Sequence, residues 1–226
     1  MRLRFIRLDC DVLIAKGKVS TLEVHNEHVF ARMVRALISA SGKYAMEPYL
    51  LLDANDKAIR PQSAIVVNSL PSLPLQDRNL VARLYKRVVQ LMESDATKYT
   101  RLHELAAQLE NEVSQIAEGL WGDYGLASDW NLEAYLKAFK FSSSGLGEDS
   151  LLDNCIKFFD LCVDVAPDSL VILVNSKSFF TQEELAILFD HAVFCGVDLL
   201  LIESWPCDTV YELECKTVLD QHFLVM

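Results

Sequence analysis

The sequence of 226 residues lacks a long hydrophobic run. No apolar stretch approaches the roughly 18 residues that a membrane-spanning helix needs. The first residues carry Arg2, Arg4 and Arg7, and they contain no continuous apolar core of the kind that a signal peptide has. We therefore expect a cytoplasmic protein that makes no contact with a membrane.

Glycine is also scarce, with eight residues in the chain. The close pairs Gly122/Gly125 and Gly145/Gly147 follow helical stretches and precede no lysine, whereas a P-loop has a Gly-rich turn and Gly-Lys-Ser/Thr after a strand. Paired catalytic carboxylates, a Ser/His/Asp set and a nucleophilic cysteine motif are missing as well. We predict that the protein is not an enzyme. A nucleotide-dependent α/β enzyme with an unusual phosphate loop remains the alternative.

None of the six cysteines forms a Cys-x-x-Cys pair, which excludes a zinc ribbon and a thioredoxin-type site. Most lie among apolar residues, as in Phe194-Cys195, and we expect reduced thiols in the core. The five histidines are scattered. His25 and His28 are three residues apart, but no cysteine or carboxylate pattern completes a metal site around them.

The most informative stretch is Leu170–Val174, five consecutive apolar residues typical of a strand buried on both faces of a parallel sheet. The polar pair Asn175-Ser176 follows, and we expect it to open the carboxyl edge of the sheet, where α/β proteins bind ligands. Thr181 and Glu184 form a capping box that starts a helix. Gly196 ends that helix, and residues 197–202 form the next parallel strand. A plain sheet core without an edge site is the alternative.

The remaining elements follow from periodicity and from capping residues. We expect further strands at residues 2–8, 11–15, 19–24, 49–52, 64–70 and 223–225. We expect helices from Asn26 to near Gly42, over 149–166 and, briefly, near 210–213. The segment 77–120 has no proline or glycine before Gly119, and its apolar spacing predicts a pair of long helices or one bent helix, with the bend at 94–97. Ser128 or Asp129 is expected to cap a helix through Tyr135, Leu136 and Phe139.

The predicted fold is therefore α/β: a head domain with one mostly parallel sheet, formed by residues 1–76 and 147–226, and an inserted all-helical leg, formed by residues 77–146. The turn Lys16-Gly17-Lys18 joins two of the head strands and carries two cations at its tip.

Charge is distributed unevenly along the chain, whose net charge is −11. Residues 1–101 hold 16 of the 21 Lys and Arg and 10 of the 32 Asp and Glu, a net of +6, which leaves a net of −17 on residues 102–226. Such asymmetry indicates an electrostatic binding face. A basic half with dispersed charges, or a fold that interleaves the halves, would cancel the field.

Two groups of residues are candidates for binding. Lys16, Lys18, Lys57 and Arg60 lie on predicted loops, from which they can reach phosphates, unless they are ordinary solvated cations. The acidic residues near Gly122 and Gly125 can offer oxygen ligands to a hard cation such as calcium, unless they are a solvated loop and a helix cap. These acidic candidates are Asp123, Asp129 and Glu133.

Taken together, the chain resembles the small CRISPR-associated adaptation proteins of type II-A systems, the Csn-two family. The similarity covers most of the chain in order and is clearest in residues 170–184, where an apolar strand is followed by Asn-Ser, Phe and Thr with acids. Weaker matches lie at Leu22-Glu23, Val29-Phe30, Asp53, Lys57, Ile59, Arg60, Val66-Val67, Leu199–Glu203 and Asp220–Val225.

The resemblance implies a P-loop-like head with a degenerate nucleotide site and an inserted helical leg. It implies a homotetrameric ring whose basic central hole takes linear double-stranded DNA without sequence preference. Calcium would support the ring. The role would be acquisition of new spacers for antiviral defence, with the CRISPR integrase and the effector nuclease as partners and no nuclease activity. A protein–protein adaptor that makes no DNA contact is a further alternative.

The match assigns roles to individual residues unevenly. Lys57, Arg60 and Lys137 fall on basic positions of the family, and we group Lys140 with Lys137. Lys16 and Lys18 lie beside the family's Arg-Gly-Gly turn. Asp129 aligns with the calcium region, whereas Asp123 and Glu133 are displaced by a residue or more.

Overall fold

The computed structural model describes residues 1–126, 129–143, 149–207, 209 and 211–225. The chain divides into two compact units. The head unit consists of Met1–Leu75 and Ser144–Met226, and the helical unit consists of Gln76–Ser143.

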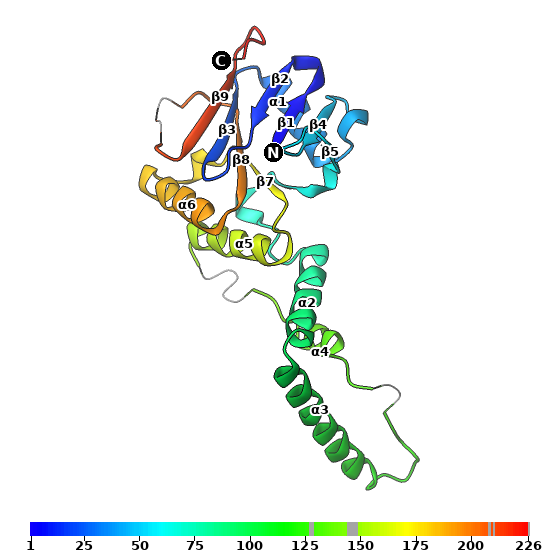
Figure 1. Cartoon of the computed structure of the whole chain (residues 1–226). Coiled ribbons are helices and arrows are strands. Elements are labelled where there is room, and N and C mark those ends of the chain that lie inside the picture. Colours follow the sequence, from blue (N-terminus) through cyan, green and yellow to red (C-terminus); the bar gives the residue numbers. More distant parts are fainter. Residues whose placement is uncertain (127–128, 144–148, 208, 210, 226) are drawn as a thin grey trace. The chain divides into compact units, whose positions relative to one another are not determined.

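The head unit contains a five-stranded sheet whose neighbouring strands are all parallel (Figure 1). Its strand order is β6 (Ala64–Val67), β7 (Leu170–Val174), β8 (Asp198–Glu203), β3 (Val19–Val24) and β9 (Glu214–Leu219). All residues of β7 and β3 are buried, because helices and a second sheet cover the two faces. The predicted parallel strands at residues 170–174 and 197–202 are confirmed.

A second, antiparallel sheet has the order β2 (Cys10–Leu13), β1 (Arg2–Phe5), β4 (Tyr49–Leu52) and β5 (Ala58–Ile59). The expectation of a single sheet was therefore wrong. These strands are buried mainly on one face, and on β1 and β2 the other face carries Arg4 and Asp11, joined by two hydrogen bonds of 2.6 Å. The Lys16-Gly17-Lys18 turn leads from β2 of this sheet to β3 of the parallel sheet.

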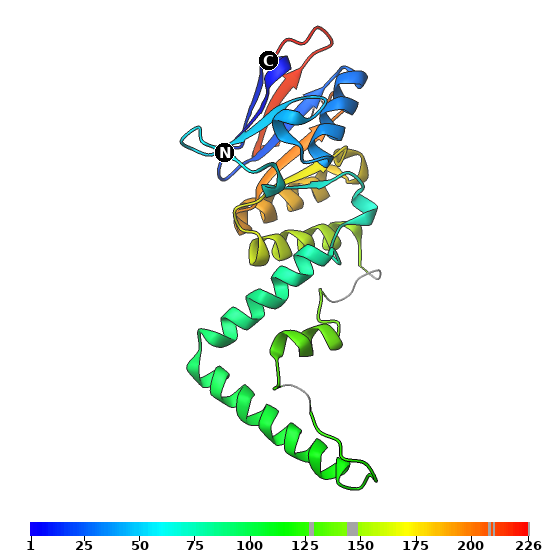
Figure 2. The same cartoon turned by 90° about the vertical axis from the view of Figure 1, so that its right-hand side faces the viewer.

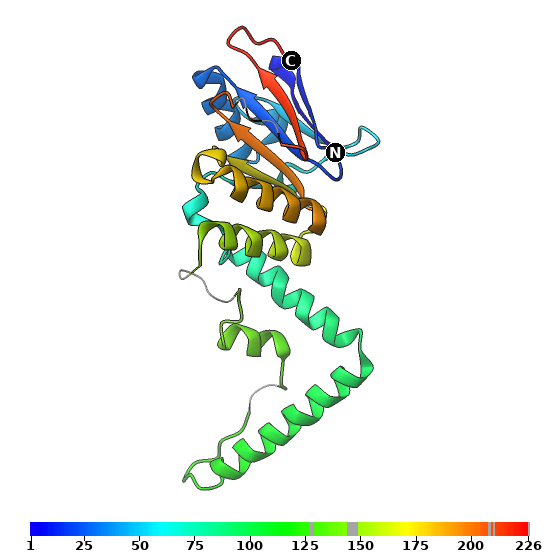
Figure 3. The same cartoon turned by 90° about the vertical axis from the view of Figure 1, so that its left-hand side faces the viewer.

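One helix lies between the two sheets and two cover the opposite face of the parallel sheet (Figures 2 and 3). The inner helix is α1 (Glu27–Ile38), whose Met33 and Leu37 pack with Phe5 and Leu22 in the main core cluster. The covering helices are α5 (Leu151–Val165) and α6 (Gln182–Cys195), which pack against each other. The capping box at Thr181 is present as predicted.

Shorter elements complete the head. The 3-10 turns are η1 (Ile6–Leu8), η2 (Gly42–Tyr44), η3 (Pro61–Ser63), η4 (Leu70–Ser72) and η5 (Lys177–Phe179). Asn26 caps α1 by accepting from the backbone N of Val29. Gly196 ends α6 with a φ of 75°, the left-handed conformation that glycine adopts without a Cβ penalty.

The C-terminal segment differs from the prediction. The strand of this region is β9, while residues 223–225 contribute only an isolated bridge between Leu219 and Val225. Residues 211–213 form no helix, and Val210 lies outside the described residues. The strand predicted at 64–70 is shorter, because it ends at Val67 and a 3-10 turn starts at Leu70.

The helical unit contains α2 (Arg78–Glu93), α3 (Ala96–Ala117) and α4 (Leu132–Ala138), and α2 contacts both others. The bend between α2 and α3 lies where it was predicted, and Asp95 caps α3. The cap of α4 is Asn131, which accepts from the backbone N of Ala134, so Asp129 does not cap it. Ser128, the other predicted cap, is outside the described residues. No helix in the described part of the chain is long and apolar enough to cross a bilayer.

Candidate functional site

At the carboxyl edge of the parallel sheet, the carboxylate of Glu203 accepts hydrogen bonds from the residues that follow β7. Oε1 of Glu203, at the end of β8, accepts from the backbone N and the Oγ of Ser176 at 2.9 Å and from the backbone N of Lys177 at 3.1 Å. Ser176 is fully buried, so the expectation that it opens the edge to solvent was wrong. Donors that an anionic ligand would use at this edge are already satisfied.

Burial raises the pKa of Glu203, while its hydrogen bonds with Lys177 and Ser176 oppose that shift. At the same edge, Asn175 connects the end of β7 to the end of β8, and it adopts a positive φ of 49°. Its Oδ1 accepts from the backbone N of Ser204 at 2.9 Å and from the Ser204 Oγ at 3.0 Å.

Two lysines near this edge also form ion pairs with glutamates. Lys177 Nζ lies 2.5 Å from Glu214 Oε1, and Lys216 Nζ lies 2.7 Å from Glu23 Oε1. The Lys177, Glu214 and Glu23 side chains are at most 8% exposed. These pairs connect β9 to β3 and to the segment after β7, and they leave neither lysine available to hold a phosphate.

The four predicted cations of the head lie on exposed turns. Lys16, Lys18, Lys57 and Arg60 are all exposed, and none makes an ion pair with another residue that the structure describes. A cavity of about 530 Å³ lies at the amino ends of the parallel strands. It is lined by residues of the turn at 16–18 and of the segment 53–59, including Lys16, Gly17, Asp53, Ala54 and Ile59.

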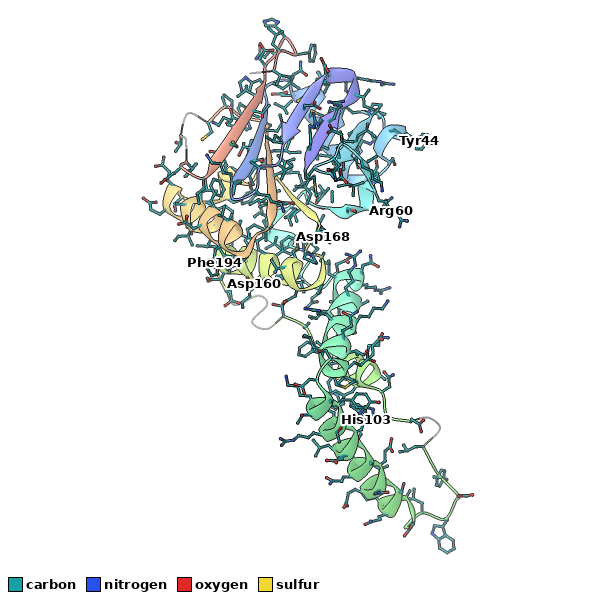
Figure 4. The ribbon with its side chains drawn as sticks, in the orientation of Figure 1. Tyr44, Arg60, His103, Asp160, Asp168 and Phe194 are labelled. Atoms are coloured by element: carbon teal, nitrogen blue, oxygen red, sulfur yellow. The ribbon has the colours of Figure 1, made fainter. Side chains whose placement is uncertain are left out.

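The structure thus brings the turn at Lys16 and the segment that contains Lys57 to one region of the head. Asp53 Oδ1 accepts from the backbone N of Lys57 at 3.0 Å and of Asn55 at 2.8 Å. These hydrogen bonds fix the turn at 53–57 and lower the pKa of Asp53. Asp168 and Asp198 line the same cavity, and Figure 4 labels Asp168 and Arg60. The cavity itself is therefore of mixed charge, with Lys16 and three aspartates among its lining residues.

The other predicted DNA contacts lie in the helical unit. Lys137 Nζ is 2.6 Å from Glu133 Oε1, four residues earlier on α4. Lys140 follows α4, is exposed and has a positive φ of 52°. An exposed pair of this kind contributes little stability, so Lys137 can exchange Glu133 for a phosphate.

Sequence reasoning missed a basic face on α2. Arg83, Lys86 and Arg87 are exposed, and no ion pair within the described ranges involves them. Their spacing of three and four residues places them on one side of a helix, a pattern that the sequence already contains. Lys86 is close enough to Glu133 to help lower the pKa of that carboxyl, after the larger effect of Lys137.

The predicted calcium ligands do not form a site in the described residues. One group of three His, Cys, Asp or Glu side chains there lies within ligand distance, and it is Asp160, His191 and Cys195. Asp123 and Asp129 are exposed and are not part of it, and Glu133 is bound to Lys137. Calcium binding therefore stays a prediction from the resemblance.

The expectation of core cysteines holds for half of them. All six thiols are free, and Cys10, Cys155 and Cys162 are buried. Cys195 and Cys207 are partly exposed and Cys215 is exposed, although Cys195 stands beside an aromatic residue in the sequence.

Comparison with known proteins places the chain in a family. The model of the family described as "CRISPR-associated protein (Cas_Csn2)" matches residues 44–223, and no curated protein matches the sequence. The fold is similar to the crystal structure of Stu0660 of Streptococcus thermophilus, with a TM-score of 0.55 and 13% identity over 96% of this chain and 74% of that chain. The family match spans most of the chain, including β4 and every later strand and helix, and we conclude that the protein belongs to the Cas_Csn2 family of CRISPR-associated proteins.

Proposed function

We propose that this protein binds linear double-stranded DNA without sequence preference, as a homotetrameric ring around the duplex. Membership of the Csn2 family implies a role in CRISPR adaptation. In the proposal, the ring acts in the cytoplasm during spacer acquisition, together with the CRISPR integrase and the effector nuclease, and it catalyses no reaction.

The observation that carries the DNA contact is the set of unpaired cations in an acidic protein. The chain has a net charge of −11, yet Lys16, Lys18, Lys57 and Arg60 stand on neighbouring exposed turns and form no ion pair within the part of the chain that the structure describes. Lysine and arginine on loops contact phosphates and carry no base readout, which fits binding without sequence preference.

Self-association is supported by an apolar stripe on α3, in the helical unit. Leu105, Leu109, Val113 and Ile116 are between 42% and 75% exposed. Their spacing of three and four residues approaches the seam of a coiled coil. An isolated helix gains nothing from such a stripe in water, so we propose that a second copy of the chain covers it.

A nucleotide-dependent enzyme is disfavoured by the head. Only His25 and Asn26 connect β3 to α1, which is too short for the glycine-rich loop that cradles phosphates in P-loop proteins. Lys177 and Lys216 are held by glutamates, which supports the proposal that the head is a P-loop-like sheet whose nucleotide site is degenerate.

The test is gel retardation of linear and covalently closed circular duplexes of equal length, at increasing salt. We expect the linear duplex to be retained, the circle to be released, and binding to weaken with salt, because phosphate contacts displace counterions. Circles held as tightly as linear duplex would contradict threading.

The double variant Lys57→Ala/Arg60→Ala separates DNA binding from an adaptor role. We expect it to lose retention, while the control Arg35→Ala/Lys43→Ala, which removes the same charge from exposed positions of the head, retains it. Unchanged retention in the first variant would favour a protein–protein adaptor. Molecular mass in solution, with and without calcium, tests the tetramer and its predicted dependence on that ion.

A further inference from the structure

Three side chains of different chemistry converge where α5 packs on α6 in the head unit. His191 Nε2 lies 2.8 Å from Asp160 Oδ1 and 3.4 Å from Cys195 Sγ, and the Asp160 and Cys195 atoms are 3.7 Å apart. Figure 4 labels Asp160 on α5 and the neighbouring Phe194 on α6.

The fold explains this convergence. His191 and Cys195 are four residues apart near the end of α6, so they share one face of the helix. α5 packs against α6 and supplies Asp160 to the same point. The three groups therefore come from two helices that the core already holds in place.

The geometry does not fit a nucleophilic cysteine. In Cys–His–Asp catalytic sets the thiol and the carboxylate contact opposite ring nitrogens, whereas here both contact Nε2 of His191. Burial, with a further contribution from Asp160, raises the pKa of the Cys195 thiol, which is the reverse of what an activated thiolate needs.

The geometry does fit three ligands of one metal ion. Zinc bonds of 2.0–2.3 Å at tetrahedral angles place N, O and S ligand atoms about 3.3–3.6 Å apart. The observed separations of 2.8, 3.4 and 3.7 Å scatter around that range. Opening the contact between His191 and Asp160 by about half an ångström completes the arrangement.

We propose that Asp160, His191 and Cys195 bind a borderline transition-metal ion of the zinc class. A set of one thiolate, one imidazole and one carboxylate suits zinc, whereas calcium and magnesium take oxygen ligands. The side chain of Asp160 is 52% exposed, so the fourth coordination position faces solvent and is filled by water or by a ligand. Bound metal would join the last turn of α6 to α5.

The test is titration of the full chain with zinc in competition with a chromophoric chelator. We expect one high-affinity zinc per chain, not displaced by calcium. Removing a ligand should weaken binding by roughly 100-fold or more, because even outer-sphere changes cost 10–100-fold. Cys195→Ser and His191→Ala test this, with Asp190→Asn and Cys215→Ser as controls that leave the three ligands intact. Cobalt bound in place of zinc should give a thiolate-to-metal charge-transfer band. The variant Cys195→Ser should abolish this band, and the control Cys215→Ser should keep it.

A second measurement needs no variant. Zinc should protect Cys195 from alkylation in the unmodified protein, as read by mass spectrometry, while the exposed Cys215 stays reactive. No tight zinc binding, or equal zinc affinity in Cys195→Ser, His191→Ala and the unmodified chain, would overturn the proposal, and so would alkylation of Cys195 at the same rate with and without zinc.

Discussion

The carboxylate of Glu203 holds Ser176 from the neighbouring strand end, with Oε1 2.9 Å from both the backbone N and the Oγ of that serine. The same oxygen accepts from the backbone N of Lys177. One acidic side chain thus satisfies three donors at the edge where parallel sheets commonly bind ligands. The stability of the head should depend on it.

Glu203→Ala should lower the free energy of unfolding by about 3 kcal/mol or more, since the substitution leaves buried donors unsatisfied at about 1–3 kcal/mol each. Glu203→Gln keeps an oxygen acceptor and should cost less than half as much. Urea unfolding followed by circular dichroism measures both values. Equal losses in the two variants would show that the hydrogen bonds of Oε1 are not what matters.

Glu203 should also make the stability of the head depend on pH. Because burial raises the pKa of Glu203 above its ordinary 4.5, the folded state retains a proton that the unfolded state has already lost. The stability that the folded state gains by keeping this proton is therefore fully present below pH 4.5, and it is lost as the pH rises through the folded-state pKa. The stability of the unmodified protein relative to Glu203→Gln should fall across that window, and a difference that stays constant with pH would contradict the assignment.

The basic face of α2 should contribute to DNA binding if the proposed function is right. Arg83→Ala/Arg87→Ala should reduce the slope of log affinity against log salt by about 0.9 for each phosphate that the variant no longer neutralises. The matched control is Lys98→Ala/Arg101→Ala on α3, where the charge of Lys98 is already offset by Asp95 at 3.1 Å. Equal slopes in the two variants would remove α2 from the interface.

The apolar stripe of α3 should control assembly. Ile116→Glu places a charge on a side chain that is 75% exposed in the single chain, so the fold of one chain should tolerate it while the interface between copies should not. Light scattering should report a smaller particle than for Ala107→Glu, a control at an exposed position of the same helix. A tetramer that survives Ile116→Glu would place the interface elsewhere.

Local patterns sufficed where structure is set by neighbouring residues. The run before Asn175, the capping box at Thr181 and the stop at Gly196 each depend on residues within one strand or one turn. β9 could not be found in this way, because Glu214 and Lys216 look like solvated charges until β3 supplies Thr21 and Glu23 from the other end of the chain. Assignment of β1, β2 and β4 to a second sheet likewise depends on pairing that no single segment encodes.

The same distinction applies to the candidate sites. Cations on turns could be predicted to be exposed, because turns lie at the surface. The hydrogen bonds of Glu203 at the sheet edge could not be predicted, because they require the strand register that sets Val174 beside Ile202. The cluster around His191 was missed because its helical spacing with Cys195 indicates a site only once Asp160 is known to come from another helix.

The position of β3 between β8 and β9 has a consequence for biosynthesis. A strand that leaves the ribosome early is flanked only by strands that are translated last, so its backbone stays unpaired on both sides while most of the polypeptide is made. The intervening segment of α2 and α3 consists of local contacts and can form first, because short-range structure forms faster than distant pairing. A nascent chain that stalls before residue 214 would present an unpaired β3 edge, open to chaperones and to aggregation.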